Sequence, residues 1–188
     1  MSRQISVKFP FLEQFSELRQ GLAGSNIEWL NDLRTDSMHR FMGLALPSPR
    51  VEEWKYTNLA ELASKPFGIL GEDKKIDELV CSNVDEIDDW EYSSDPRLVF
   101  INGKFDATSS AVKRVPAGVT VTTLADALIS HPDLVRSHME RMASFQNESL
   151  LALNTAYASS GLVILVDDGV LIDAPIELVF ISSTRLPT

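Results

Sequence analysis

The carboxyl-terminal stretch of the chain most constrains the fold. After Gly161, three short apolar runs, LVILV, VLI and IELVFI, are separated by the turn sequences DDG and DAP. Turn residues at intervals of about six are typical of a β-solenoid or a tight meander, not of helices. One or two solenoid turns cannot cover their own apolar end faces, and the pattern still runs at Thr188. It therefore predicts the front part of a longer protein.

The first part of the chain carries helical periodicity instead. Apolar residues recur at helical spacing over residues 10–22 and again over residues 27–43. Ser25 and Glu28 have the spacing of a capping box at the start of the second stripe. Residues 48–61 are typical of two short helical turns with a break between them. We therefore expect a helical amino-terminal region.

The middle of the chain mixes strand and helix signals. The dipeptide NG between LVFI and KF is the common hairpin signal, because both turn positions favour positive φ. A strand is expected over residues 119–123, followed by helices over residues 123–128 and 132–142. A further helix over residues 147–160 has Gly161 in place for a left-handed cap.

Together these patterns predict an α+β protein in three parts. Residues 1–95 would form the helical amino-terminal domain, residues 96–160 a small mixed α/β segment, and residues 161–188 the first turns of the β-solenoid. The first boundary follows from residues 67–95, where apolar residues thin out and acidic ones accumulate, as is usual between structural units.

Composition narrows the classes of function. The chain has 17 basic and 27 acidic residues and a formal net charge of -10, which disfavours nucleic acid and anionic membranes as partners. The start lacks the apolar run of a signal peptide, and LVILV is too short to span a bilayer. The single cysteine, Cys81, cannot form an internal disulfide and is best interpreted as a packing residue. A soluble, cytoplasmic protein is predicted.

Sequence motifs for common catalytic and metal chemistry are absent. The sequence contains no GxxxxGK[ST], GxGxxG, HExxH or CxxC pattern. The acidic run from Asp85 departs from the EF-hand pattern at Trp90 and Pro96. His131 and His138 have no third ligand at metal spacing, so they are interpreted as surface or capping residues. We expect no catalytic and no metal-binding residue.

The segment LPSPRVEEWKYTNL, residues 46–59, is the candidate site. Arg50, Trp54, Lys55 and Tyr56 could form a docking patch, because Trp, Tyr and Arg dominate interface energetics. The other interpretation is structural: the two aromatic residues anchor the short helices and the arginine pairs with a nearby carboxylate. The structural interpretation is favoured, since a short helix needs large apolar anchors.

Several segments resemble one known family. The helix that contains Trp29 and Phe41, then GLALP, then Pro49, Arg50 and EEWKYTNL, resembles the amino-terminal region of the SufD family of the SUF iron-sulfur cluster assembly machinery. The later segments RLVFINGKF, GVTVTTLADAL and ALNTAYASSGLVILVDDGVLIDAPIELVFIS are similar to its entry into a β-helical core. The resemblance follows the family's order over nearly the whole chain. The related SufB shares the β-helix, but GLALP and EEWKYTNL resemble the SufD pattern.

This resemblance implies a scaffold rather than an enzyme. Its core would be a right-handed parallel β-helix, paired with a SufB-like protein and bound to a SufC-like ATPase. The complex handles iron-sulfur clusters. Within it, SufD has a role in iron acquisition and SufC uses the ATP. No cofactor is expected on this segment. The family's SufB and SufC contacts lie beyond Thr188, so none is assigned to residues of this chain.

Other functions are kept as alternatives. The mixed α/β segment would suit a small-molecule enzyme, which needs a pocket with convergent polar and titratable groups. A carbohydrate-processing β-helix protein and a stand-alone interaction module are further possibilities. Independently of these, the open solenoid end at residues 162–181 predicts self-association.

Overall fold

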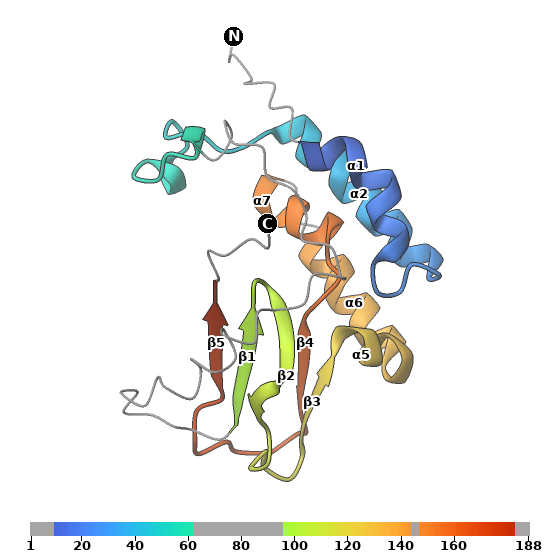
Figure 1. The fold of residues 1–188 in the computed structure, drawn as a ribbon, viewed down its shortest axis with the longest axis vertical. Helices are drawn as coiled ribbons and strands as arrows, with labels where there is room; N and C mark the ends of the chain where they lie inside the picture. The colour runs from blue at the N-terminus through green and yellow to red at the C-terminus, as the bar shows by residue number, and fades with distance from the viewer. Residues whose placement is uncertain (1–9, 62–95, 144–146, 183–188) are drawn as a thin grey trace. The chain divides into compact units, whose positions relative to one another are not determined.

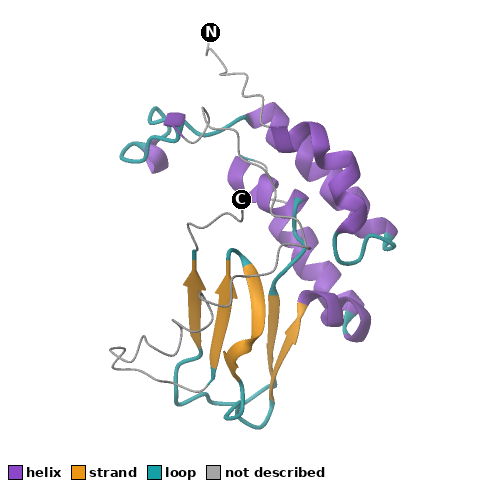
Figure 2. Cartoon of the chain, in the orientation of Figure 1, coloured by secondary structure: helices purple, strands orange, loops and turns teal. Residues whose placement is uncertain are grey.

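The computed structural model describes residues 10–61, 96–143 and 147–182. The chain forms two compact units, and each is built from two separate stretches of sequence. The helical unit comprises Met1–Ile69 and Ala127–Ser159, and the strand unit comprises Leu70–Asp126 and Ser160–Thr188. Figure 2 shows the helices and strands of the described residues.

The helical unit contains α-helices and short 3₁₀ turns. Its elements are α1 (Pro10–Leu18), η1 (Arg19–Gly21), α2 (Glu28–Leu44), η2 (Glu52–Trp54), α6 (Pro132–Ala143) and α7 (Ser149–Ala156). Helix α5 (Leu124–Ser130) begins in the strand unit and ends in the helical unit.

The core of the helical unit forms where α2 packs against α7. Met38 and Phe41 lie three positions apart on α2, and Ala152 and Ala156 lie four apart on α7, so each pair shares one helix face. The small alanine side chains let the two helices approach closely. Phe15 of α1 completes this buried cluster. The apolar periodicity of the sequence thus identifies the faces that meet.

A buried arginine connects distant segments of the same unit. Arg34 is 0% exposed, and its Nη2 donates hydrogen bonds of 2.6 Å to the carbonyl oxygens of Ala23 and Ala158. These bonds join the turn before α2 to the segment after α7. Burial lowers the pKa of the guanidinium to about 10 because it disfavours the charged form.

The strand unit contains a mixed three-stranded sheet in the order β2-β1-β5 (Figure 1). Strands β1 (Arg97–Ile101) and β2 (Lys104–Ala111) form an antiparallel hairpin, and β5 (Glu177–Ile181) pairs with β1 in parallel. Asn102 and Gly103 form the turn with φ values of 50° and 81°. The predicted NG hairpin is therefore confirmed.

A second sheet pairs β3 (Val119–Thr123) with β4 (Leu162–Val166) in antiparallel register. Helix α5 follows β3 directly, and Thr123 caps it. The Oγ1 of Thr123 accepts a 3.1 Å hydrogen bond from the Asp126 backbone N–H and donates a 2.6 Å bond to the Asp126 carboxylate. This reciprocal pair supplies partners at the start of the helix.

Several local predictions are wrong. The VLI run, Val170–Ile172, forms no strand, and Leu171 is 85% exposed. Ser25 does not cap α2: the cap residue is Ile27, and no side chain bonds to it. Instead, the Ser25 carbonyl accepts a hydrogen bond from the Asn31 side chain. Helix α7 ends earlier than predicted, and its closing residue Tyr157 has φ of -105°.

Gly161 also differs from expectation. It does not have the positive φ of a left-handed cap; its carbonyl accepts the Leu124 N–H at 2.9 Å. This bond continues the ladder of β3 and β4 by one residue. The glycine therefore belongs to the sheet rather than to the end of the helix.

At the level of fold class, the α+β prediction is confirmed. Each compact unit nevertheless combines residues from different predicted parts. Helices α6 and α7, from the predicted part 96–160, pack with α2 in the helical unit. Strands β4 and β5, from the predicted part 161–188, pair with β3 and β1 in the strand unit. The described pairings of β5 with β1 and of β4 with β3 contain no complete β-helix turn. Continuation into a parallel β-helix stays a prediction. No helix of the described residues is long and apolar enough to cross a membrane.

Candidate functional site

The candidate site is a cavity of about 190 Å³ in the helical unit. Three segments line it. The end of α2 and the following loop contribute Leu44, Ala45 and Pro47; the η2 turn contributes Val51, Glu53 and Trp54; and residues 147–150 form the remaining wall at the start of α7. The cavity thus joins segments almost one hundred residues apart in sequence.

Local chain geometry places the η2 segment. Ala45 has a φ of 57° and ends α2, and Pro47 and Pro49 then disfavour continuation of a helix. The Val51 N–H donates to the Ser48 carbonyl at 2.9 Å, so the chain turns tightly before η2. The turn brings Glu53 and Trp54 to the cavity.

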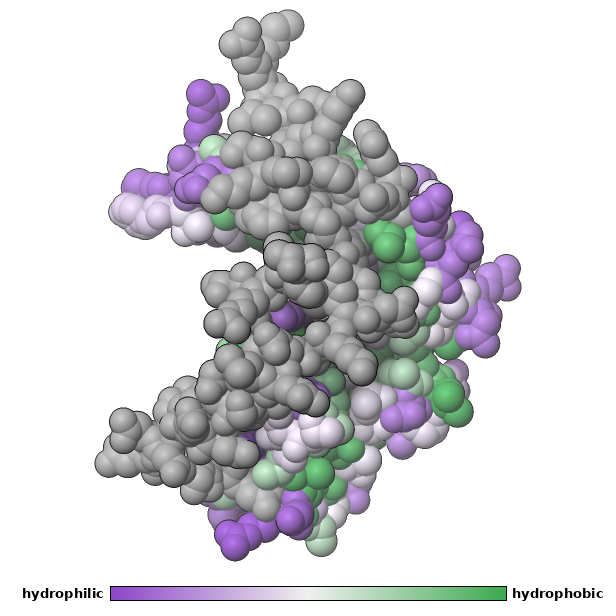
Figure 3. All heavy atoms as spheres, viewed as in Figure 1, coloured by the Kyte–Doolittle hydropathy of each residue, from purple (hydrophilic) through white to green (hydrophobic). Residues whose placement is uncertain are grey.

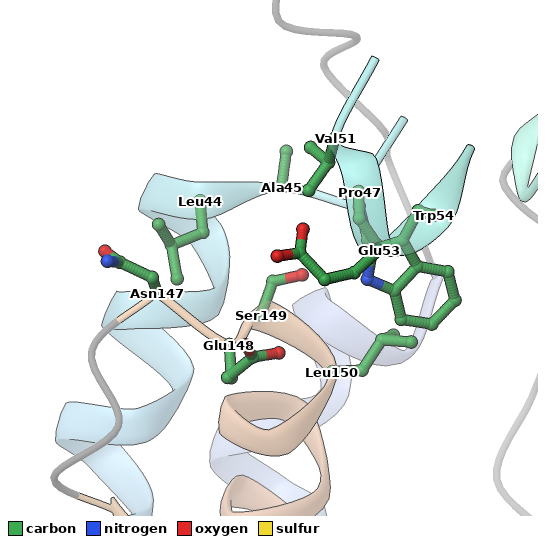
Figure 4. Close-up of a pocket in the computed structure, with 10 residues that line it drawn as sticks. All are labelled: Leu44, Ala45, Pro47, Val51, Glu53, Trp54, Asn147, Glu148, Ser149 and Leu150. Carbon is green, nitrogen blue, oxygen red and sulfur yellow. The ribbon is translucent and has the colours of Figure 1, made fainter. Parts of the chain in front are cut away.

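Figure 4 shows how the side chains lie. The Glu53 carboxylate reaches from η2 toward Ser149, and the Trp54 ring lies beside Leu150. Glu148 comes from the start of α7 and contributes a second carboxylate. The site combines an aromatic ring, an apolar wall and two acidic groups.

The four residues predicted from sequence have different environments. Trp54 is half-buried and lines the cavity, whereas Arg50, Lys55 and Tyr56 are exposed and do not line it. The Lys55 ammonium lies 3.6 Å from the Glu52 carboxylate and 5.6 Å from the centre of the Tyr56 ring. The structure therefore brings only part of the predicted patch to the cavity.

The anchoring interpretation is wrong for Tyr56, whose side chain is 92% exposed. Arg50 forms no ion pair with any carboxylate of the described residues, so the expected pairing is not seen there either. Trp54 is the one aromatic residue of this segment that packs partly inward. In Figure 3 hydrophilic and intermediate colours cover the segment around η2. The docking role of the four residues stays a prediction.

The side chains with shifted pKa values lie outside this cavity. The pKa of the Tyr157 phenol is raised to about 12 by burial. For Asp106, burial by itself raises the pKa, but hydrogen bonds from Ser109 and Thr108 lower it overall. Neither these groups nor Arg34 lines the cavity.

Histidines and acidic residues form no metal site in the described part of the chain. No group of three or more potential ligands comes together there. His131 Nδ1 lies 2.8 Å from the Ser130 hydroxyl, and His138 Nδ1 lies 2.8 Å from Arg141 Nη2. Both histidines are exposed, as their surface interpretation predicts. Cys81 and the acidic run that begins at Asp85 lie outside the described residues.

Sequence reasoning missed the other half of the cavity. Asn147, Glu148 and Ser149 carry no motif, and only the packing of α7 against α2 brings them to Trp54. Glu53 precedes Trp54 in the sequence and was not among the predicted residues. A possible signal was the large, half-exposed tryptophan, which needs a second wall to pack against.

Comparison with known proteins identifies the family. The SufBD protein N-terminal region matches residues 6–178, so the chain belongs to the SufBD family. It is also 27% identical over 139 residues to an iron-sulfur cluster assembly SufBD family protein from Synechocystis sp.. The match covers 74% of this chain and 29% of that relative. The match thus spans less than a third of the relative's length. The SufB/SufD family is confirmed, and the assignment to SufD in particular stays a prediction.

Proposed function

We propose that the chain is the front part of a scaffold subunit in the SUF iron-sulfur cluster assembly complex. The observation that carries the proposal is the family match over residues 6–178. The relative from Synechocystis, whose name gives iron-sulfur cluster assembly, supports it. Within the family, GLALP and EEWKYTNL favour a SufD-like rather than a SufB-like subunit.

In this proposal the protein is cytoplasmic, pairs with a SufB-like subunit, binds a SufC-like ATPase and supports iron acquisition. It acts without catalysis of its own and binds no cofactor on this segment. Iron-sulfur clusters are the cargo of the complex, and ATP is used by the SufC-like partner. The cavity next to Trp54 offers an aromatic ring, apolar side chains and two carboxylates for binding.

We further propose that the first turns of a parallel β-helix begin in the strand unit. The support is the parallel pairing of β5 with β1, in which Leu98 faces Leu178 and Phe100 faces Phe180. Parallel strands need a long connection, and this one includes β2 to β4 and three helices. Further parallel strands would add along β5, whose second edge meets no other described strand.

The same edge predicts self-association when this segment is prepared alone. Phe180 is 69% exposed although its ring stacks on Phe100 at 4.9 Å, and Leu178 on the same strand is also exposed. An exposed apolar edge strand pairs readily with another copy. Light scattering over a concentration series should show dimers, and Phe180→Lys should reduce them. Leu171→Lys, a loop change, is the control; a monomer at all concentrations would contradict the proposal.

The decisive experiment captures the native gene product from its own cells through an affinity tag. Intact mass and identification of the co-purified proteins are then measured. We expect a SufB-like protein and a SufC-like ATPase in stoichiometric amounts. A product that purifies without either protein, under conditions that retain other weak complexes, would refute the scaffold role. Recovery of a SufD-like protein as its partner would instead identify the chain as SufB-like.

A further inference from the structure

The size of the cavity limits what can occupy it. Pockets for drug-sized ligands and cofactors enclose about 300–1,000 Å³. The cavity between η2 and the start of α7 holds about 190 Å³ and is partly open. It therefore suits a single side chain rather than a nucleotide or another large cofactor.

The charge of the cavity selects the kind of side chain. Glu53 and Glu148 are both exposed, and neither forms an ion pair with a cation of the described residues. On the same segment, Lys55 pairs with Glu52, and Arg50 is exposed and pairs with neither carboxylate. The two carboxylates are thus available to a cation from outside the chain.

The remaining walls suit the stem of a basic side chain. Lysine and arginine carry an aliphatic stem that packs on apolar surface while the charged head stays near water. Leu44, Val51 and Leu150 provide such a surface, and the Trp54 ring lies beside it (Figure 4). A cation near a tryptophan ring gains further electrostatic attraction. The tryptophan ring, the apolar wall and the two carboxylates therefore all favour a basic side chain.

We propose that this cavity binds a basic side chain of a partner polypeptide, arginine in preference to lysine. The carboxylates come from two different elements, η2 and the start of α7, so a planar guanidinium with several donors can address both. The net charge of -10 steers a basic partner toward the chain. The inference goes beyond the proposed function and holds whichever protein supplies the side chain.

The test is an NMR titration of the ¹⁵N-labelled chain with capped tripeptides of the form Gly-X-Gly, where X is arginine, lysine, norleucine or glutamate. The indole signal of Trp54 is assigned with Trp54→Phe. We expect the arginine peptide to shift this signal and the amides of residues 147–150 most strongly, with lysine next. Added salt should weaken both, since exposed charges are screened.

Matched variants distinguish the effect of the two cavity carboxylates on binding from the effect of the chain's overall negative charge. Glu53→Gln and Glu148→Gln should each raise the Kd of the arginine peptide about two- to fivefold, the range for partly exposed ion pairs. Glu17→Gln on α1 makes the same charge change away from the cavity and should leave the Kd unaltered. All three positions are exposed, so folding is not at risk.

Four results would overturn the inference. Equal shifts with norleucine would indicate an apolar occupant, and stronger shifts with glutamate would indicate an anion site. Shifts that appear on concentrating the chain without peptide would assign the cavity to a second copy. No response, or Glu53→Gln and Glu148→Gln indistinguishable from Glu17→Gln, would remove the site. Each result is independent of whether SUF proteins co-purify with the native product.

Discussion

Two glycines of the strand unit share a backbone conformation but differ in their surroundings. Gly118 and Gly169 both have φ of 79°. A Cβ atom added at Gly118 would lie 2.6 Å from Cγ2 of Val170, whereas one added at Gly169 would meet nothing within 4 Å. Substituting each by alanine therefore separates backbone strain from a steric clash.

The expected magnitudes follow from these two terms. A left-handed conformation costs an alanine about 1–2 kcal/mol, and the lower entropy of its unfolded chain offsets about 0.4–1 kcal/mol. Gly169→Ala should therefore lower the free energy of unfolding by about 1.6 kcal/mol or less. At Gly118 the overlap with Val170 adds about 1–3 kcal/mol, as overpacking does elsewhere.

The assay is urea unfolding, with hydrogen exchange of the β3 and β4 amides as a local measure. Gly118 lies next to β3, and its carbonyl accepts the Asp167 N–H at 2.9 Å, so the loss should appear there. Val170→Ala should recover about 0.5–3 kcal/mol in the Gly118→Ala background, because the two changes share one contact. Equal losses for the two alanine variants, or no recovery, would refute the placement of Val170 against Gly118.

Three further predictions concern single side chains. Thr123→Ala should lower stability by about 0.5–2 kcal/mol in urea unfolding, because α5 loses the cap formed with Asp126; Thr123→Ser should restore most of it. Phe15→Ala should cost about 3–5 kcal/mol, whereas Met42→Ala, at a position 61% exposed, should change stability little. Burial raises the pKa of the Tyr157 phenol to about 12. Phenolate absorbance is measured against pH for wild type and Tyr157→Phe, and the difference between the two curves should titrate near pH 12. A difference that titrates near pH 10 would contradict this. The folded chain holds that proton more tightly than the unfolded chain, so the contribution of Tyr157 to stability falls as the pH rises from about 10 to about 12.

Local signals predicted secondary structure well where the cause was local. The turn at Asn102 and Gly103 and the change from strand to helix at residue 123 depend on neighbouring residues, and both are observed. The capping box at Ser25 failed, because α2 begins at Glu28 with Ile27 as its cap residue, and Ser25 lies in the preceding turn. Residue spacing alone does not show where the first turn of a helix begins.

Half of the candidate site could be predicted. The sequence identified Trp54 because a large aromatic residue in a short, charged segment needs a structural or binding role. It also grouped Tyr56 with it as an anchor, although that ring is 92% exposed. One exposed turn offers too little surface to bury both aromatic rings, and only one of them meets a wall from α7.

The sequence by itself determined the elements and the family. Helical periodicity, the hairpin signal and the ordered segments from Trp29 onward are properties of neighbouring residues, and they predicted an α+β chain of the SufB and SufD type. Only the tertiary structure decided which distant segments meet. Packing of α2 against α7 brings Glu53 and Glu148 to one cavity, and parallel pairing joins β1 to β5. These contacts lower the free energy by removing apolar faces from water, a sum over the whole fold that no single segment contains.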